Sequence, residues 1–346
     1  MARSMRKKEV YVLNNIFGID LGTSTIKIYN KSTDSTMVEK NMIAIQNKKN
    51  VLAYGDDAYD MYEKAPSNIK VTYPLNNGVI ADINNMETLV RLFITDEMKG
   101  NVKPADYYIA IPYDITEVEK RAFTDLIHDS GVKAKKVHVV YKAVADGLGM
   151  DVDVKNSNGV LVVNVGYDTT EISVLSLGGI VLSKLIKVGG RKFDESIRSA
   201  IRKEYSLIIG SKTSENVKKE LRNLEKEGKP AVVYGRDIVT GLPIEREIPT
   251  DIINNALVEN FDNILDNVKA TLERTPPELA ADIYRNGLYL TGGASQVCHL
   301  AQRLSNGCGL NVNISEEPVE SVTLGLSKII KDEQYKSLAI VEGSGK

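Results

Sequence analysis

The stretch that decides the fold is Ile16–Tyr29, with the sequence IFGIDLGTSTIKIY. An apolar run ends in Asp20, a turn of small and hydroxyl residues follows, and a second apolar run starts at once, which predicts a β-hairpin with a polar tip. Gly22 allows a ligand to approach the backbone closely, and successive N–H groups beside hydroxyls form a site for an anion. The hydroxyl residues of the turn are Thr23, Ser24 and Thr25. By itself this pattern fits either a phosphate-binding turn or an ordinary surface hairpin.

Two charged residues of the hairpin favour the phosphate interpretation. Asp20 stands at the end of the first strand, where a carboxylate can hold a hydrated Mg²⁺ ion through water. Lys27 points away from the side chains of Ile26 and Ile28, because side chains alternate along a strand, and can reach a phosphate as a point charge.

A second copy of the pattern lies at Gly159–Ser176, GVLVVNVGYDTTEISVLS, about 140 residues farther along the chain. An apolar run leads into a turn with a glycine and paired threonines, and an alternating strand follows. The candidate binding residues of this turn are Asn164, Gly166, Tyr167, Asp168 and Thr169. Two such units predict a duplicated α/β fold that clamps phosphates between its halves.

A third glycine site lies in Gly287–Ala294, GLYLTGGA, where a strand runs into a glycine pair and a helix-like pattern. That order brings backbone close to a nucleotide at a helix N-terminus. Its candidate binding residues are Gly292, Gly293 and Ala294.

These three sites, in this order, resemble the phosphate-1 hairpin, the phosphate-2 hairpin and the adenosine loop of the actin-like ATPase superfamily. Within it the chain is most similar to the bacterial cytoskeletal MreB family. The segments more particular to that family are Asp56–Ala58 within YGDDAYDM, Asn77–Ile83 (NGVIADI), Val188–Ile197 (VGGRKFDESI) and Thr275–Ile283 (TPPELAADI). The resemblance covers roughly Phe17 to Lys331. It implies a bilobed actin-like fold with two duplicated α/β lobes, ATP or ADP with Mg²⁺ in the interlobe cleft, and polymerisation into filaments.

The resemblance also implies small subdomains inserted into each lobe. The expected parts are a flexible basic N-terminal arm (1–15), the lobe I core IA (16–32, 76–158 and 318–334), subdomain IB (33–75), the lobe II core IIA (159–190 and 251–317), subdomain IIB (191–250) and a flexible tail (335–346). Residues 33–75 are polar and are expected to be rich in loops. Subdomain IIB is expected to hold two helices, Ser196–Tyr205 and Ser214–Glu227, and then a hairpin that turns near Thr240-Gly241.

The phosphate-2 hairpin departs from the family's pattern. The family's usual DIGGGTT is replaced by NVGYDTT, so Asn164 takes the place of an aspartate, and Tyr167 and Asp168 take the place of glycines. Tyrosine adds bulk and restricts positive φ at a turn that should surround phosphates. Asp168 brings an anion toward anionic phosphates.

The family's Glu-Glu-Pro run, one of whose glutamates helps to position the attacking water, aligns with Tyr141-Lys142-Ala143. Asp146 lies one helical turn farther and offers a carboxylate from a different position. Loss of a water-orienting group costs about 10²–10⁴ in rate, so we expect slow or absent ATP hydrolysis. Asp20 and Asp168 remain candidates for a catalytic role, and compensation by Asp168 or Glu171 is an open alternative.

The adenosine side keeps more of the family's pattern. Its expected contacts are Gly189, Gly190, Glu215, Lys218, Gly292 and Gly293, with Ala294 in the place of a third glycine. Glu215 and Lys218 share one helical face because they are three residues apart.

Composition constrains the function less. The 346 residues suffice for two domains, and a net charge of −2 gives no basic excess that would favour nucleic acid. The two cysteines, Cys298 and Cys308, show neither metal-like spacing nor a disulfide framework, which suits a reducing cytoplasm. The histidines His128, His138 and His299 are scattered and are interpreted as ordinary surface or core residues.

The N-terminus, MARSMRKKEVYVLNN, clusters four basic residues with apolar partners. It fits either an amphipathic helix on an anionic membrane surface or a basic arm without fixed structure. The resemblance implies a cytoplasmic protein that meets the inner face of the membrane and forms filaments, paired in antiparallel fashion. The alternative is a non-polymerising nucleotide-binding accessory subunit that modulates an active MreB-type relative.

Overall fold

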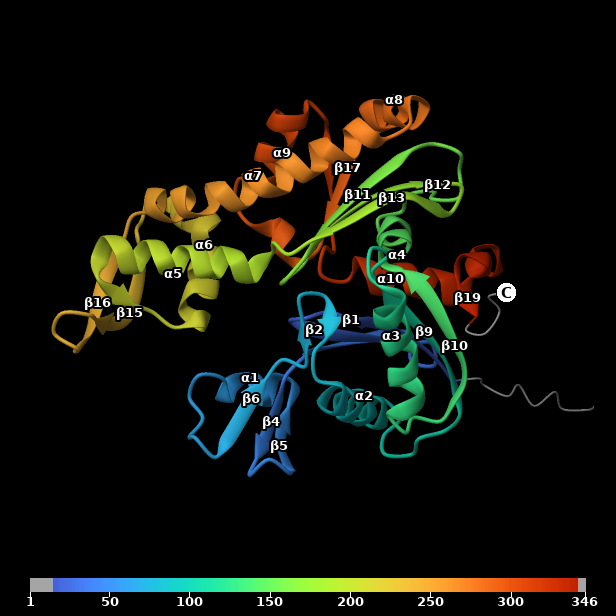
Figure 1. Cartoon of the computed structure of the whole chain (residues 1–346), viewed down its shortest axis with the longest axis horizontal. Coiled ribbons are helices and arrows are strands. Elements are labelled where there is room, and N and C mark those ends of the chain that lie inside the picture. The colour runs from blue at the N-terminus through green and yellow to red at the C-terminus, as the bar shows by residue number, and fades with distance from the viewer. Residues whose placement is uncertain (1–14, 342–346) are drawn as a thin grey trace, which may run out of the picture.

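The computed structural model describes residues 15–341 as two lobes, each built on one mixed β-sheet (Figure 1). The lobe I sheet has the strand order β19-β10-β9-β1-β2-β3, and the lobe II sheet has the order β13-β12-β11-β17-β18. The lobe I strands are β1 (Asn15–Leu21), β2 (Thr25–Asn30), β3 (Ser35–Lys40), β9 (Ala105–Ile111), β10 (Ala134–Tyr141) and β19 (Ile340–Val341). The lobe II strands are β11 (Val160–Val165), β12 (Thr170–Ser176), β13 (Gly179–Ile186), β17 (Leu288–Thr291) and β18 (Val312–Ile314).

The two sheets repeat one topology. In each, the first three strands form an antiparallel meander, and two later strands add in parallel on the other side of the first. The hairpin turns also match, because the N–H of Gly22 donates to the carbonyl of Thr25 at 3.1 Å, and that of Gly166 donates to Thr169 at 2.8 Å. The predicted duplication of an α/β unit is therefore confirmed.

The central strands are apolar because both faces of each sheet are covered. Phe17, Ile19 and Leu21 of β1 point into one core with the helices α2 (Ile83–Glu97) and α3 (Glu117–Asp129). On the opposite face, a side chain at Gly18 would lie 3.1 Å from Leu326 of α10 (Ser321–Lys331), so glycine lets that helix pack closely on the strand.

The lobes meet at two helices that cross between the sheets, α4 (Lys142–Gly149) and α10 (Figure 1). A Cβ atom at Gly149 would lie 1.9 Å from the carbonyl oxygen of Ser321, and one at Gly325 would lie 1.9 Å from that of Ala145. Small residues on both helices therefore allow their backbones to touch. Because α4 contacts strands of both sheets, this crossing forms the joint between the lobes.

The three longest helices of the described residues lie in lobe II: α5 (Gly190–Tyr205), α6 (Ser211–Glu227) and α7 (Thr250–Arg274). Lobe II also holds α8 (Pro277–Asn286) and α9 (Leu300–Cys308), with a 3-10 turn, η1 (Gly293–Gln296), after β17. Subdomain IIB adds the sheet β14 (Leu207–Ile208), β15 (Ala231–Asp237) and β16 (Pro243–Ile248). The expected pair of helices and the expected hairpin with a turn near Thr240-Gly241 are thus present.

Subdomain IB is more regular than the sequence predicted. Residues 33–75 hold a three-stranded sheet with the helix α1 packed on it, and the expectation of a loop-rich insert is wrong. Its elements are β4 (Ile43–Gln46), β5 (Asn50–Tyr54), β6 (Ile69–Thr72) and α1 (Gly55–Met61), and a short hairpin of β7 (Leu75–Asn76) and β8 (Val79–Ile80) follows. The sheet forms because Met42, Ala44 and Ala58 give this polar segment a small buried core of its own.

Two expected boundaries change. Strand β3 pairs with β2 along its whole length and so belongs to the lobe I sheet rather than to the insert. The expected flexible tail is wrong for residues 335–341, because η2 (Glu333–Leu338) is helical and β19 pairs with His138 and Val139 of β10.

The basic arm, up to residue 14, lies outside the described residues. Within residues 15–341 no helix combines the length and apolarity needed to cross a bilayer.

The helix crossing gives a stability prediction. Gly325→Ala places a methyl group against the backbone of α4, so we expect the free energy of unfolding to fall by about 1–3 kcal/mol. Chemical denaturation measures this change. Gly179→Ala, whose Cβ would meet its nearest atom at 3.7 Å, is the matched control and should stay within about 0.5 kcal/mol of wild type. Equal effects of the two substitutions would contradict a tight crossing.

Candidate functional site

A cavity of about 1130 Å³ lies between the lobes, and the three glycine sites meet in it. Every predicted site residue except Gly189 lines this cavity. Gly189 lies behind the phosphate-2 turn, where a Cβ atom would stand 2.6 Å from the carbonyl oxygen of Gly166. Gly22, Gly166 and Gly293, one from each glycine site, therefore converge on one cleft.

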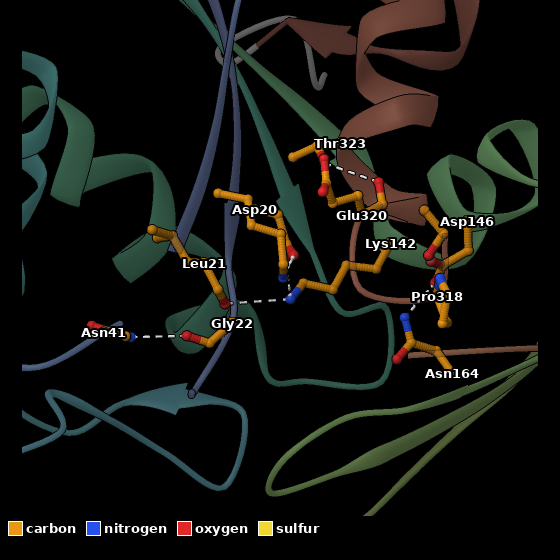
Figure 2. Close-up of polar contacts among 12 residues, drawn as sticks. Asp20, Leu21, Gly22, Asn41, Lys142, Asp146, Asn164, Pro318, Glu320 and Thr323 are labelled. Atoms are coloured by element: carbon orange, nitrogen blue, oxygen red, sulfur yellow. Dashed lines mark hydrogen bonds and ion pairs between the residues drawn. The ribbon is translucent and has the colours of Figure 1, made fainter. Parts of the chain in front are cut away.

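The floor of the cavity is built around the Asp20 carboxylate, which ends β1 and is 3% exposed. Lys27 Nζ lies 2.8 Å from Oδ2, because the two residues are cross-strand partners in the hairpin. Lys142 Nζ lies 2.8 Å from Oδ1 and also donates to the carbonyl oxygen of Leu21 (Figure 2). Burial would raise the pKa of Asp20, but the two ammonium groups outweigh it and hold this pKa far below its usual range.

This pairing bears on the predicted Mg²⁺ contact. A cation held through water needs a carboxylate with a free lone pair, and both oxygens of Asp20 face an ammonium group. Asp20 can therefore bind a metal only if its oxygens are shared with the two lysines. The oxygen ligands that lie beside it in the cavity are the hydroxyls of Thr23, Ser24 and Thr25.

Lys142 is the first residue of α4, directly after β10. Burial would lower its pKa, but the contact with Asp20 outweighs burial and raises it, so the side chain remains an ammonium group. The position at which the family pattern has a carboxylate is thereby filled by a cation. A cation cannot accept a proton from water, so it cannot act as a base there.

Asp146 does not replace the missing carboxylate. It is fully buried, and it accepts hydrogen bonds from Asn164 Nδ2 at 2.7 Å and from Ser321 Oγ at 2.6 Å (Figure 2). Burial raises its pKa to about 6, while the two donors act in the opposite direction. The hydrogen bond between Asn164 and Asp146 explains why an asparagine stands at position 164. An aspartate there would place two carboxylates against each other.

Glu171 of β12 is the carboxylate of the cavity floor that is not paired with a lysine or an arginine. It is 5% exposed, accepts from the backbone N–H of Tyr113 at 3.2 Å, and lies 3.4 Å from Ser183 Oγ. Burial raises its pKa to about 7, against the smaller effect of the Tyr113 N–H. A group with such a pKa can exchange protons at neutral pH.

Asp168 joins the two lobes. Its Oδ1 lies 2.7 Å from Arg191 Nε, and its Oδ2 accepts from the backbone N–H of Asn77 in the β7–β8 turn of lobe I at 2.8 Å. The ring of Tyr167 lies tilted at 38° to that of Tyr73 of lobe I, with ring centroids 5.9 Å apart, and the guanidinium of Arg191 lies over both rings. The two residues that replace glycines therefore form a contact across the cleft.

The adenosine side is lined by α5, α6 and the turn after β17. The Lys218 ammonium lies 2.7 Å from Asp194 and donates to the carbonyl of Gly190. Glu215 accepts from the hydroxyl of Tyr59 in subdomain IB at 2.8 Å. Burial would raise the pKa of Glu215, but Lys219, Lys40 and Tyr59 lower it to about 2.

Gly292 has the backbone conformation that only glycine adopts freely. Its φ is +88°, and a Cβ atom would lie 2.4 Å from the carbonyl oxygen of Val165. The N–H of Ser295 then donates back to the Gly292 carbonyl and starts η1. The turn thus presents backbone rather than side chains to the cavity.

Residues 14–337 match the model of the MreB/Mbl protein family. The chain belongs to the MreB/Mbl family. The cell shape-determining protein Mbl of Bacillus subtilis (strain 168) is 36% identical over 312 residues, which is 89% of this chain and 93% of that protein. MreB of Escherichia coli (strain K12) is 32% identical over 336 residues, which is 94% of this chain and 96% of that protein. The predicted family resemblance is confirmed.

Solved structures agree with this family. MreB 5 of Spiroplasma citri bound to AMPPNP has a TM-score of 0.86 at 32% identity and covers 94% of this chain and 98% of that one. The structure of the same protein bound to ADP has a TM-score of 0.85. The MamK double helical filament gives 0.75 at 19% identity, which shows the shared fold alone. The actin-like bilobed α/β fold is thereby confirmed.

Several cavity residues do not belong to the glycine-site patterns of the sequence. Lys40, Arg222 and Lys226 line the cavity together with the predicted residues. The last two could have been found, since they continue the helical face of Glu215 and Lys218 at spacings of four. Lys40 could not, because nothing in its local sequence places β3 beside α6.

The buried Glu171 predicts a pH dependence of stability. The pKa of an unfolded glutamate, near 4.5, rises to about 7 on folding, so the folded chain holds the proton more tightly. The contribution of Glu171 to the free energy of unfolding therefore falls as pH rises from about 4.5 to 7, by roughly 3 kcal/mol. Glu171→Gln should lose less stability than wild type between pH 5 and pH 8 in chemical denaturation. Glu273→Gln, an exposed control, should follow wild type, and identical curves for all three proteins would contradict the prediction.

Proposed function

We propose that this chain is a nucleotide-binding subunit of a cytoskeletal filament that determines bacterial cell shape, and that it hydrolyses ATP weakly or not at all. The observation that carries the weak hydrolysis is the ion pair of Lys142 with Asp20, because Tyr141-Lys142-Ala143 aligns with the Glu-Glu-Pro run that holds the family's water-positioning glutamate. Membership of the MreB/Mbl family supports the cellular role, since the curated relatives are named cell shape-determining proteins.

The proposed nucleotide lies with its phosphates between the two glycine turns. The turn N–H groups, the hydroxyls of Thr23, Ser24 and Thr25, and the ammonium of Lys27 are suitable donors for phosphate oxygens. The adenosine would meet Glu215, Lys218 and the Gly292–Ala294 turn. The similar MreB 5 structures, bound to AMPPNP and to ADP, support ATP and ADP as the ligands.

Mg²⁺ would enter together with the nucleotide. It commonly binds through one or two carboxylates, water and substrate phosphates, and Asp20 offers the nearest carboxylate. Because Lys27 and Lys142 already compensate the charge of Asp20, this chain's own residues supply little additional charge for the metal. The phosphates would therefore provide most of its ligands.

Hydrolysis requires a group that orients water toward the terminal phosphate. Lys142 can instead form an ion pair with phosphate oxygens, which favours retention of a bound nucleotide. Assembly would then depend on nucleotide binding or protein concentration rather than on turnover. Glu171 is the residue that could support the remaining activity, because its pKa is close to neutral.

The filament proposal rests on the family, in which head-to-tail contacts repeat without closure. Subdomains IB and IIB contact each other across the cleft through the hydrogen bonds of Tyr59 with Glu215 and of Glu63 with Ser211. We propose a cytoplasmic filament, in antiparallel pairs, that lies at the inner face of the membrane. A non-polymerising accessory subunit of an active MreB-type relative is the second candidate, favoured by the altered catalytic residues.

Phosphate release tests the role of Lys142. Restoring the family's Glu-Glu-Pro run with Tyr141→Glu, Lys142→Glu and Ala143→Pro together should raise the rate of ATP hydrolysis at least about tenfold, because a water-orienting group contributes about 10²–10⁴. Asn164 should be kept, since an aspartate there would meet Asp146.

The control is Lys136→Glu, which makes the same Lys-to-Glu exchange as at position 142 but at an exposed site on β10, the strand that leads into α4. It should leave phosphate release at the wild-type rate. Wild-type turnover already as fast as that of an intact MreB would defeat the proposal of a weakened site.

Pelleting and negative-stain imaging test assembly. We expect filaments with ATP, ADP and AMPPNP alike, because a chain that hydrolyses slowly should assemble on nucleotide binding alone. Anionic liposomes in parallel samples test the membrane contact. Light scattering that reports monomers at every concentration, with each nucleotide and with liposomes, would favour the accessory subunit instead.

A further inference from the structure

Three side chains with metal-binding atoms meet at the rim of the cleft, beyond the adenosine side. They are Glu225 in the last turn of α6 and the adjacent residues Cys298 and His299, between η1 and α9. Cys298 Sγ lies 3.2 Å from Glu225 Oε2, and His299 Nε2 lies 2.9 Å from both oxygens of the same carboxylate. One donor atom from each residue falls within 4.8 Å of the others.

The backbone at His299 makes this convergence possible. Neighbouring side chains normally point to different sides of an extended chain. His299, however, has a left-handed backbone with a φ of +68°, which non-glycine residues seldom adopt. The turn directs the imidazole and the thiol of Cys298 toward the same carboxylate. Cys298 is buried while His299 is largely exposed, so the cluster is open to solvent on one side.

The distances suit a small tetrahedral cation. Zinc binds sulfur at about 2.3 Å and nitrogen or oxygen at about 2.0–2.2 Å, so its ligand atoms stand about 3.3–3.6 Å apart. The hydrogen-bonded contacts of 2.9 and 3.2 Å need to widen by only a few tenths of an ångström. A thiolate and a carboxylate together balance the two charges of the ion, and the neutral imidazole completes the set.

The carboxylate also has an orienting partner. Asn254 of α7 donates its amide to Glu225 Oε1 at 2.5 Å. Such outer-shell hydrogen bonds fix the orientation of a ligand before a metal binds. Three elements of lobe II, α6, α7 and the turn before α9, therefore support the cluster.

We propose that Glu225, Cys298 and His299 form a site for a thiophilic divalent cation of the zinc class, with water in the fourth position. On binding, the Cys298 thiol forms a bond from sulfur to the metal and releases its proton to solvent. The ion would link α6 to the turn that follows Gly292-Gly293, and so fix two walls of the cleft. Oxygen-preferring Mg²⁺ would be excluded by the sulfur and nitrogen ligands.

Metal titration of the full chain tests the site. Protein freed of metal with a chelator, and kept reduced with a phosphine, is titrated with Zn²⁺ by calorimetry and with Co²⁺ by absorbance. We expect one ion per chain and a cobalt–thiolate charge-transfer band in the near ultraviolet. Cys298→Ser should abolish the band, and Glu225→Gln and His299→Asn should each weaken Zn²⁺ binding at least about tenfold. Asparagine is chosen because it tolerates positive φ.

Cys308→Ser is the matched control, since Cys308 is the second free thiol and lies at the far end of α9. It should keep the wild-type affinity and the band. Circular dichroism of each variant separates loss of the site from loss of the fold. The proposal is overturned if wild type shows no saturable binding, or if Cys298→Ser binds like wild type. It is also overturned if Cys308→Ser, correctly folded, loses the band.

Discussion

The buried Asp20 carboxylate must be neutralised, and most features of the cleft follow from how this chain does it. A carboxylate out of contact with water is stable only when it is paired. Lys27 is supplied by the hairpin itself, and Lys142 is supplied by the start of α4, so the pairing joins the phosphate-1 turn to the helix that leads into lobe II. The same contact places a cation in the run that aligns with the family's Glu-Glu-Pro.

The other residues that depart from the family pattern also make structural contacts. Asn164 donates to the buried Asp146, and Asp168 accepts from Asn77 and pairs with Arg191. Asn164 and Asp168, which are unusual at a phosphate-binding turn, each have a hydrogen-bond or ion-pair partner. Several of these partners come from the other lobe, so the residues that depart from the family pattern add contacts across the cleft.

Helix α4 links these features physically. Its first residue neutralises Asp20, its middle carries Asp146, and its end crosses α10 at Gly149. Because packed helices change position in discrete steps rather than by gradual deformation, the charge at the start of α4 and the glycine contact at its end belong to one rigid element. One short helix therefore contacts both the floor of the cleft and the joint between the lobes.

The sequence by itself determined the duplicated hairpins, the order of the three glycine sites and the loss of a carboxylate at Lys142, because these depend on local patterns of apolar, glycine and charged residues. Only the tertiary structure showed that Lys142 pairs with Asp20, that Tyr167 meets Tyr73, and that Ile340–Val341 add a strand to β10. It also brought Glu225 to Cys298 and His299 across more than 70 positions of sequence. Those contacts join segments that are distant along the chain, and no local spacing encodes which distant side chain will neutralise a buried charge.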